Sequence, residues 1–117
     1  MASIDELVRD FRIAAMEKGD EGGALDGALH DRLRASFRQL AALGDPGRTA
    51  FATLLSDPAP AVRGWVAAQL LVDGDARALP VLQELARQEG IGGFNAQMVV
   101  REYEKGTLKS PFSDSAA

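Results

Sequence analysis

Residues 57–71 read DPAPAVRGWVAAQLL, two prolines followed by a run rich in alanine, valine and leucine. Proline is tolerated in the first turn of an α-helix, where its missing N–H has no partner to lose. We therefore expect Asp57 to cap a helix, Pro58 to occupy its first position and Pro60 to lie in its first turn. The apolar residues that follow recur at helical spacing and predict its buried face: Val62, Val66, Ala67, Leu70 and Leu71.

The rest of the chain repeats this helical spacing of apolar residues, interrupted by glycine, proline and aspartate, and shows no strand-like alternation. Ser3 with Glu6 predicts a capping box at the first helix, and Gly106 after Lys105 predicts the end of the last one. Six helices are expected, over about residues 3–18, 25–43, 47–56, 58–72, 76–89 and 94–105.

Six helices with short connections favour an all-α fold in which three antiparallel hairpins follow one another as a short α-solenoid. A chain of 117 residues is long enough for one domain with its own core, and we expect this domain to cover residues 1–109. Residues 110–117, SPFSDSAA, are mostly small or polar and are predicted to be a disordered tail. The glycines within residues 90–93 are interpreted as a flexible turn.

The motif DPxPxVR at residues 57–63 is followed by small and apolar residues. It resembles the HEAT repeat, in which an aspartate-proline turn precedes a helix bearing valine-arginine and small residues. Residues 75–85 are similar to the second helix of that repeat. The resemblance implies an ARM-like α-α superhelix, whose stacked hairpins expose an extended binding surface.

The segments LVRDF, VRGWVAAQLL, GIGGFNAQMVV and EYEKGTLKSP also resemble a small bacterial family of HEAT-like proteins defined by a domain of unknown function. Related HEAT-like groups include scaffolds, lyase-like chaperones of pigment proteins, and neutralising partners of bacterial toxins. The resemblance therefore implies binding to another molecule, and it implies no particular reaction.

The composition, 46% apolar and 26% charged residues, is typical of a folded protein. The absence of cysteine excludes disulfides and thiolate metal sites. The N-terminal sequence lacks a basic region followed by an apolar run, and no stretch is long enough to cross a bilayer. We expect a cytoplasmic protein that has no contact with a membrane.

The net charge is −4, yet residues 32–63 carry five arginines against two acids. An acidic protein gains little from counterion release on nucleic acid, which argues against a nucleic-acid partner. The basic segment has two interpretations: a site for an acidic partner or phosphate, and solvated arginines that bridge neighbouring acids, which we favour. The arginines are Arg32, Arg34, Arg38, Arg48 and Arg63.

Asp26, His30 and Arg34 follow one face of a predicted helix and are the best candidates for a chemical site. A metal site needs three or more converging ligands, and this set offers two. No serine or cysteine nucleophile in a recognisable setting accompanies His30, which is the only histidine. We therefore expect no metal, no cofactor and no catalysis, and interpret the set as a solvated polar stripe. Trp65 is expected in the core rather than on a binding surface.

Two functions from different classes are compatible with these features. The first is a non-catalytic protein–protein interaction module or scaffold, of which a toxin-neutralising immunity protein is one form. The second is a small-molecule-binding protein or lyase-like chaperone enzyme with a polar site around Asp26, His30 and Arg34. For the first function, the partner is another protein, and the candidate partner-binding residues are Arg48, Thr49, Arg77, Glu84, Arg87 and Gln88.

Overall fold

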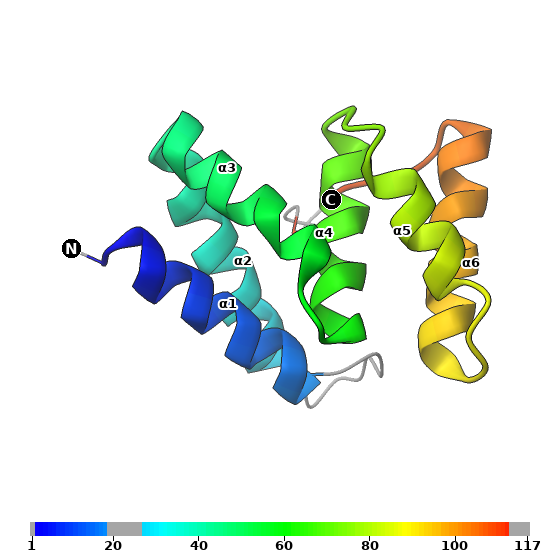
Figure 1. Cartoon of the computed structure of the whole chain (residues 1–117), viewed down its shortest axis with the longest axis horizontal. Helices are drawn as coiled ribbons and strands as arrows, with labels where there is room; N and C mark the ends of the chain where they lie inside the picture. The colour runs from blue at the N-terminus through cyan, green and yellow to red at the C-terminus, as the bar shows by residue number, and fades with distance from the viewer. Residues whose placement is uncertain (1, 19–26, 113–117) are drawn as a thin grey trace.

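The structure is a computed structural model in which residues 2–18 and 27–112 are described. These residues form six α-helices and one 3-10 turn, without a strand, so the all-α prediction is confirmed for them (Figure 1). The elements are α1 (Ile4–Lys18), α2 (Gly27–Ala42), α3 (Asp45–Thr53), the 3-10 turn η2 (Leu54–Ser56), α4 (Pro60–Val72), α5 (Ala78–Leu85) and α6 (Ile91–Lys105).

The predicted end of the last helix is confirmed, and one of the two hydrogen bonds of the predicted capping box is present at the first helix. At the start of α1, the backbone N–H of Glu6 donates a hydrogen bond to Ser3 Oγ (3.2 Å). At the end of α6, Gly106 adopts a φ of 74°, a left-handed conformation that glycine accepts without strain and that ends many helices. Local sequence therefore decides both boundaries.

The start of α6 differs from the prediction. The helix begins at Ile91 rather than at Phe94, so the glycines that follow Ile91 are helical and do not form a flexible turn. A Cβ added at Gly93 would lie 1.7 Å from the backbone oxygen of Gln88. Glycine is needed at this position because the chain before α6 passes directly against the helix backbone.

The helix that follows the DPAP motif also begins later than predicted. α4 starts at Pro60, so Pro58 lies before the helix and not at its first position. Ala59 is extended, with φ −83° and ψ 119°, because a residue that precedes proline is pushed out of the helical region. Asp57 accepts a hydrogen bond from the Ala59 N–H (2.9 Å), and so it caps the turn before α4 rather than the helix itself.

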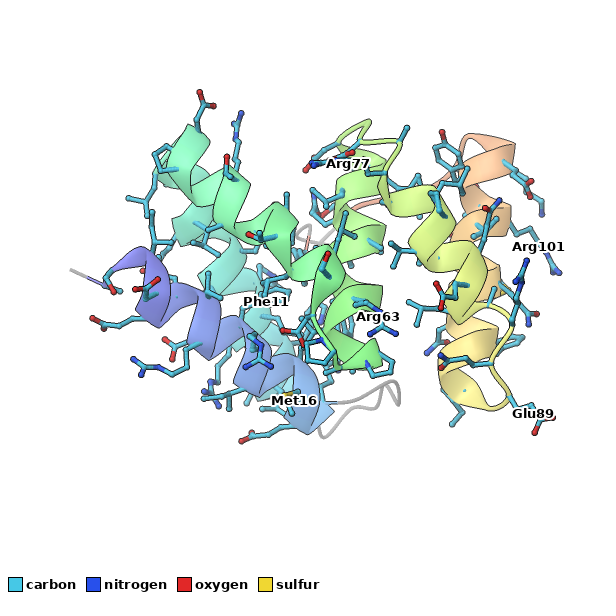
Figure 2. The ribbon with its side chains drawn as sticks, viewed as in Figure 1. Phe11, Met16, Arg63, Arg77, Glu89 and Arg101 are labelled. Atoms are coloured by element: carbon cyan, nitrogen blue, oxygen red, sulfur yellow. The ribbon has the colours of Figure 1, made fainter. Side chains whose placement is uncertain are left out.

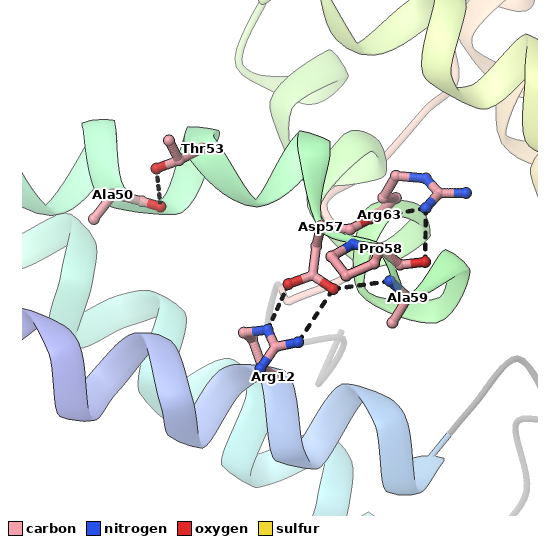
Figure 3. A network of polar contacts seen from close by, with 7 residues as sticks. All are labelled: Arg12, Ala50, Thr53, Asp57, Pro58, Ala59 and Arg63. Carbon is pink, nitrogen blue, oxygen red and sulfur yellow. Dashed lines mark hydrogen bonds and ion pairs between the residues drawn. The ribbon is translucent and has the colours of Figure 1, made fainter.

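Asp57 also connects α4 to α1. Its carboxylate is ion-paired with Nε of Arg12, and Nη2 of Arg12 lies 3.4 Å from the other carboxylate oxygen (Figure 3). Arg63 donates from the first turn of α4 to the backbone oxygens of Asp57 (2.8 Å) and Pro58 (3.1 Å). Arg63 thus contacts Asp57 through the backbone, whereas the Asp57 carboxylate binds Arg12.

One hydrophobic core joins the helices. Val66, which was predicted to be buried, is 0% exposed, and Leu82 of α5 is 1% exposed. α1 packs on α2, α4 on α5, and α5 on α6, and a further contact between α1 and α4 joins the first helices to the last (Figure 1). The radius of gyration is 13.3 Å, close to the value of about 13 Å expected for a compact domain of 100 residues.

The end of the described chain belongs to this core. Phe112 is 2% exposed. Its ring centroid lies 5.1 Å from that of Phe37, 5.7 Å from that of Phe11 and 6.0 Å from that of Trp65. Trp65, which was expected in the core, is half-buried and packs against the same aromatic rings.

The segment before Phe112 returns from α6 past α4 (Figure 1), and the Ser110 hydroxyl donates to the side-chain oxygen of Gln69. The packed domain therefore continues to Phe112 at least, beyond the predicted boundary at residue 109. The sequence does not indicate this continuation, because the residues around Phe112 are mostly polar and a single aromatic residue gives no periodic signal. Residues 113–117 of the predicted tail lie outside the described residues.

Candidate functional site

A cleft of about 970 Å³ lies among α2, α3, η2, the end of α4 and the start of α5. Its polar lining residues are mostly exposed and form the rim, whereas its apolar lining residues are buried or half-buried and form the floor. The floor consists of Phe37, Phe51, Ala52, Leu55, Leu70 and Val81.

Three of the predicted partner-binding residues line this cleft. Arg48 and Thr49 are neighbours on α3, and Arg77 precedes α5. Arg77 stands at the turn that joins α4 to α5 (Figure 2). The fold thus brings together, across the cleft, residues that are separated in the sequence.

The charge of Arg77 is compensated within the turn. Its Nη2 lies 2.6 Å from Oδ2 of Asp75, and its Nε lies 3.0 Å from Oδ1 of the same carboxylate. The Arg77 side chain lowers the pKa of Asp75 by donating these hydrogen bonds, and burial opposes this effect only in part. The carboxylate is therefore ionised at neutral pH and holds the guanidinium at the rim.

Arg48 has a different environment. Its side chain is exposed and makes no hydrogen bond or ion pair within the described residues. The other carboxylate of the rim, Asp73, accepts a hydrogen bond from Nε2 of Gln69 (3.0 Å). Arg48 is consequently the cation of the cleft that retains its full capacity for an anionic group from outside.

The other three predicted residues do not line the cleft. α5 ends at Leu85, so Arg87 and Gln88 lie in the turn beyond it, and Glu84 is an exposed residue of its last turn. Gln88 lines a second, apolar pocket, and Glu84 and Arg87 line neither. The helix was predicted to continue to residue 89, and this end of the prediction is wrong.

Sequence reasoning missed Asp73 and Asp75 as parts of the site. These residues lie between the helices predicted over 58–72 and 76–89, and no role in a site was assigned to them. A positive φ of 88° at Gly74 makes this turn tight, and it places both carboxylates on the cleft. Two acids flanking a glycine, followed closely by Arg77, were the available signal.

The alternative polar site is arranged differently from the prediction. Asp26 lies outside the described residues. His30 is half-buried, with its ring centroid 5.7 Å from that of Trp65, and Arg34 is half-buried and paired with Asp31 at 3.6 Å. The interpretation of this face as a solvated stripe is therefore wrong for His30 and Arg34.

Burial lowers the pKa of His30, and the positive charges of Lys18 and Arg34 lower it further. A backbone hydrogen bond with Pro111 and the charge of Asp31 oppose this shift. The net effect favours a neutral imidazole near neutral pH, packed beside the rings of Trp65 and Phe112.

In the described part of the chain, no three histidine, cysteine, aspartate or glutamate side chains converge as metal ligands do. Within the same residues, each helix is too short or too polar to traverse a bilayer. Comparison of the chain with known protein families, with curated proteins and with solved structures gave no match.

Proposed function

We propose that the chain is a short HEAT-like helical-repeat module that binds another protein through the cleft and catalyses no reaction. The DPxPxVR motif before α4 and the packing of successive helices on each other support a repeat of this kind. The arrangement in three antiparallel hairpins is part of the proposal.

The composition of the cleft is the observation that carries the proposal. An apolar floor beside an exposed cation suits an amphipathic segment of a partner protein. Apolar side chains of that segment contact the floor residues Phe37, Leu55 and Val81. An aspartate or glutamate of the same segment pairs with Arg48, since this guanidinium has no described partner.

The ionisable groups of the cleft are poorly suited to catalysis. They are two carboxylates and two guanidiniums, and the lowered pKa of Asp75 removes it as a proton donor near neutral pH. Thr49, Thr53 and Ser56 supply hydroxyls, but the cleft lining contains no histidine or cysteine that could act beside them. Binding is the chemistry that these groups perform well.

The test is a crosslinking experiment in cells of the native host. A photoreactive residue at Thr49 should crosslink to one partner, whereas the same residue at Gln83, which is exposed on α5 and outside the cleft lining, should not. The association of the purified partner is then measured with two charge reversals. Arg48→Glu should weaken it about tenfold, mainly through the association rate and more strongly at low salt.

Arg101→Glu is the matched control, because Arg101 is also an exposed arginine and points outward from α6, away from Arg77 (Figure 2). It should leave the affinity unchanged. Equal effects of the two reversals would mean that only net charge matters and that the cleft is not the binding site.

A further inference from the structure

A second pocket, of about 290 Å³, lies among α4, α5, α6 and the segment that follows α6. On α4, its lining residues Ala61, Gly64 and Ala68 share one helical face, whereas Leu70 and Asp73 of the cleft lie on the opposite face. The pocket and the cleft are therefore separate sites.

The interior of this pocket is apolar. Leu82 and Leu85 of α5 are buried, and Val99 of α6 and Trp65 of α4 are half-buried. The polar lining residues Gln88 and Asn95 are both exposed, which places them at the mouth of the pocket. Such a site is complementary to a molecule with an apolar body and one hydrogen-bonding group.

Glycine at position 64 leaves space for the pocket but makes α4 less stable than alanine would. It lies in the middle of α4, where glycine is less stable than alanine, and its φ is not positive. A Cβ added there would have a single neighbour within 4 Å, Leu85 Cδ1 at 3.9 Å. Packing does not require glycine here, in contrast to Gly93, and the space beside Gly64 is part of the pocket.

The walls are held in place without a ligand. The close approach of Gly93 to Gln88 fixes the start of α6 against the end of α5. Pro111 lines the pocket next to Trp65, and the residues on either side of Pro111 anchor it: Ser110 binds Gln69, and Phe112 is buried in the core. A pocket formed in advance loses little conformational entropy when it is filled.

We propose that this pocket binds a small neutral aromatic molecule of one or two rings that carries a hydroxyl or amide group at the mouth. An apolar cavity of about 150 Å³ is known to take up benzene, and this pocket is nearly twice that size. Trp65 lines the pocket, and its ring already stacks on Phe112 and lies under Lys18 Nζ. Edge contact with the indole favours an aromatic ring over a saturated one.

The experiment uses the full chain and p-cresol as the probe. Because Trp65 is the only tryptophan, its fluorescence reports directly from the pocket, and the methyl resonances of Leu82, Leu85 and Val99 provide an independent NMR readout. Saturable shifts of both signals are expected. Cyclohexanol, the saturated comparison, should bind roughly tenfold more weakly.

Gly64→Leu should reduce p-cresol affinity by about tenfold or more, because its side chain occupies the pocket. Ala35→Leu is the control, since it adds the same side chain to an exposed position of α2, and it should bind like the wild type. If Gly64→Leu does not fold, Gly64→Ala serves instead, with a raised melting temperature and weakened binding expected. The proposal is overturned by a wild type without saturable shifts, by unchanged affinity in the Gly64 variant, or by equal binding of cyclohexanol.

Discussion

The carboxylate of Asp57, in the loop before α4, is bound by the guanidinium of Arg12 on α1, across 45 positions of the chain (Figure 3). The Asp57 side chain is 5% exposed and that of Arg12 is 36% exposed. One carboxylate therefore fixes the turn that starts α4, through the Ala59 N–H, and attaches this turn to the first helix. The DPAP motif thus contributes to tertiary structure as well as to the start of a helix.

Arg12→Ala should destabilise the protein by about 1–3 kcal/mol, since it leaves a buried carboxylate without its main hydrogen-bond donor. The lower part of this range is expected because the Arg12 side chain is partly exposed. Urea denaturation gives the free energy of unfolding. The control, Arg9→Ala, removes an exposed arginine from the same helix and should change it by less than about 0.5 kcal/mol. An equal decrease in the free energy of unfolding in both variants would show that the Arg12–Asp57 pair does not stabilise the fold.

The same pair makes stability depend on acid pH. Burial raises the pKa of Asp57, but hydrogen bonds from Arg12 and the Ala59 N–H lower it more, so the folded pKa lies below its ordinary value. The resulting stabilisation is complete above the unfolded pKa of about 3.9 and is lost as the pH falls through the folded pKa. The free energy of unfolding should therefore decline less steeply in Asp57→Asn than in the wild type below about pH 5. Chemical denaturation at several pH values gives the free energy of unfolding as a function of pH. If this free energy falls equally steeply in Asp57→Asn and in the wild type, Asp57 is not the source of the pH dependence.

The sequence was most informative where a structural feature depends on adjacent residues. Ser3 and Gly106 indicated helix ends because capping and a left-handed φ are local properties. The start of α4 at Pro60 could also have been predicted from the sequence, because a residue that precedes proline is usually extended and Ala59 precedes Pro60. The burial of Val62 and Val66 followed from helical periodicity.

Features that depend on distant contacts were not predictable in this way. Phe112 is buried by rings from α1, α2 and α4, none of which is close to it in sequence. Arg48 and Arg77 were predicted from the sequence and line the cleft, but the cleft itself was not predicted. The position of the end of α5 and its packing on α4 determine which exposed residues face each other. Periodicity gives the buried side of a helix but not its neighbours.

Phe112→Ala should cost about 3–5 kcal/mol, the usual loss when a large buried aromatic side chain is removed from a packed core. A disordered tail, as predicted from composition, would give no loss. Phe94→Ala is the matched control, because Phe94 is 58% exposed on α6, and it should be nearly neutral. Thermal and urea unfolding of both variants distinguish the two descriptions of the chain end. Equal stability of the Phe112 variant and the wild type would show that Phe112 belongs to the predicted disordered tail and not to the core.

Gly93→Ala should be strongly destabilising. The added Cβ would lie 1.7 Å from the Gln88 backbone oxygen, and a backbone cannot give way as the end of a flexible side chain can, so the start of α6 must move away from α5. Overpacking of this kind costs about 1–3 kcal/mol or more. Gly64→Ala is the internal control: the same change in another helix has room for the methyl group and should stabilise the protein by up to about 1 kcal/mol through helix propensity. The free energy of unfolding should therefore change in opposite directions in the two variants. A stabilised Gly93→Ala protein would show that the predicted flexible turn, and not the close contact with Gln88, describes residues 90–93.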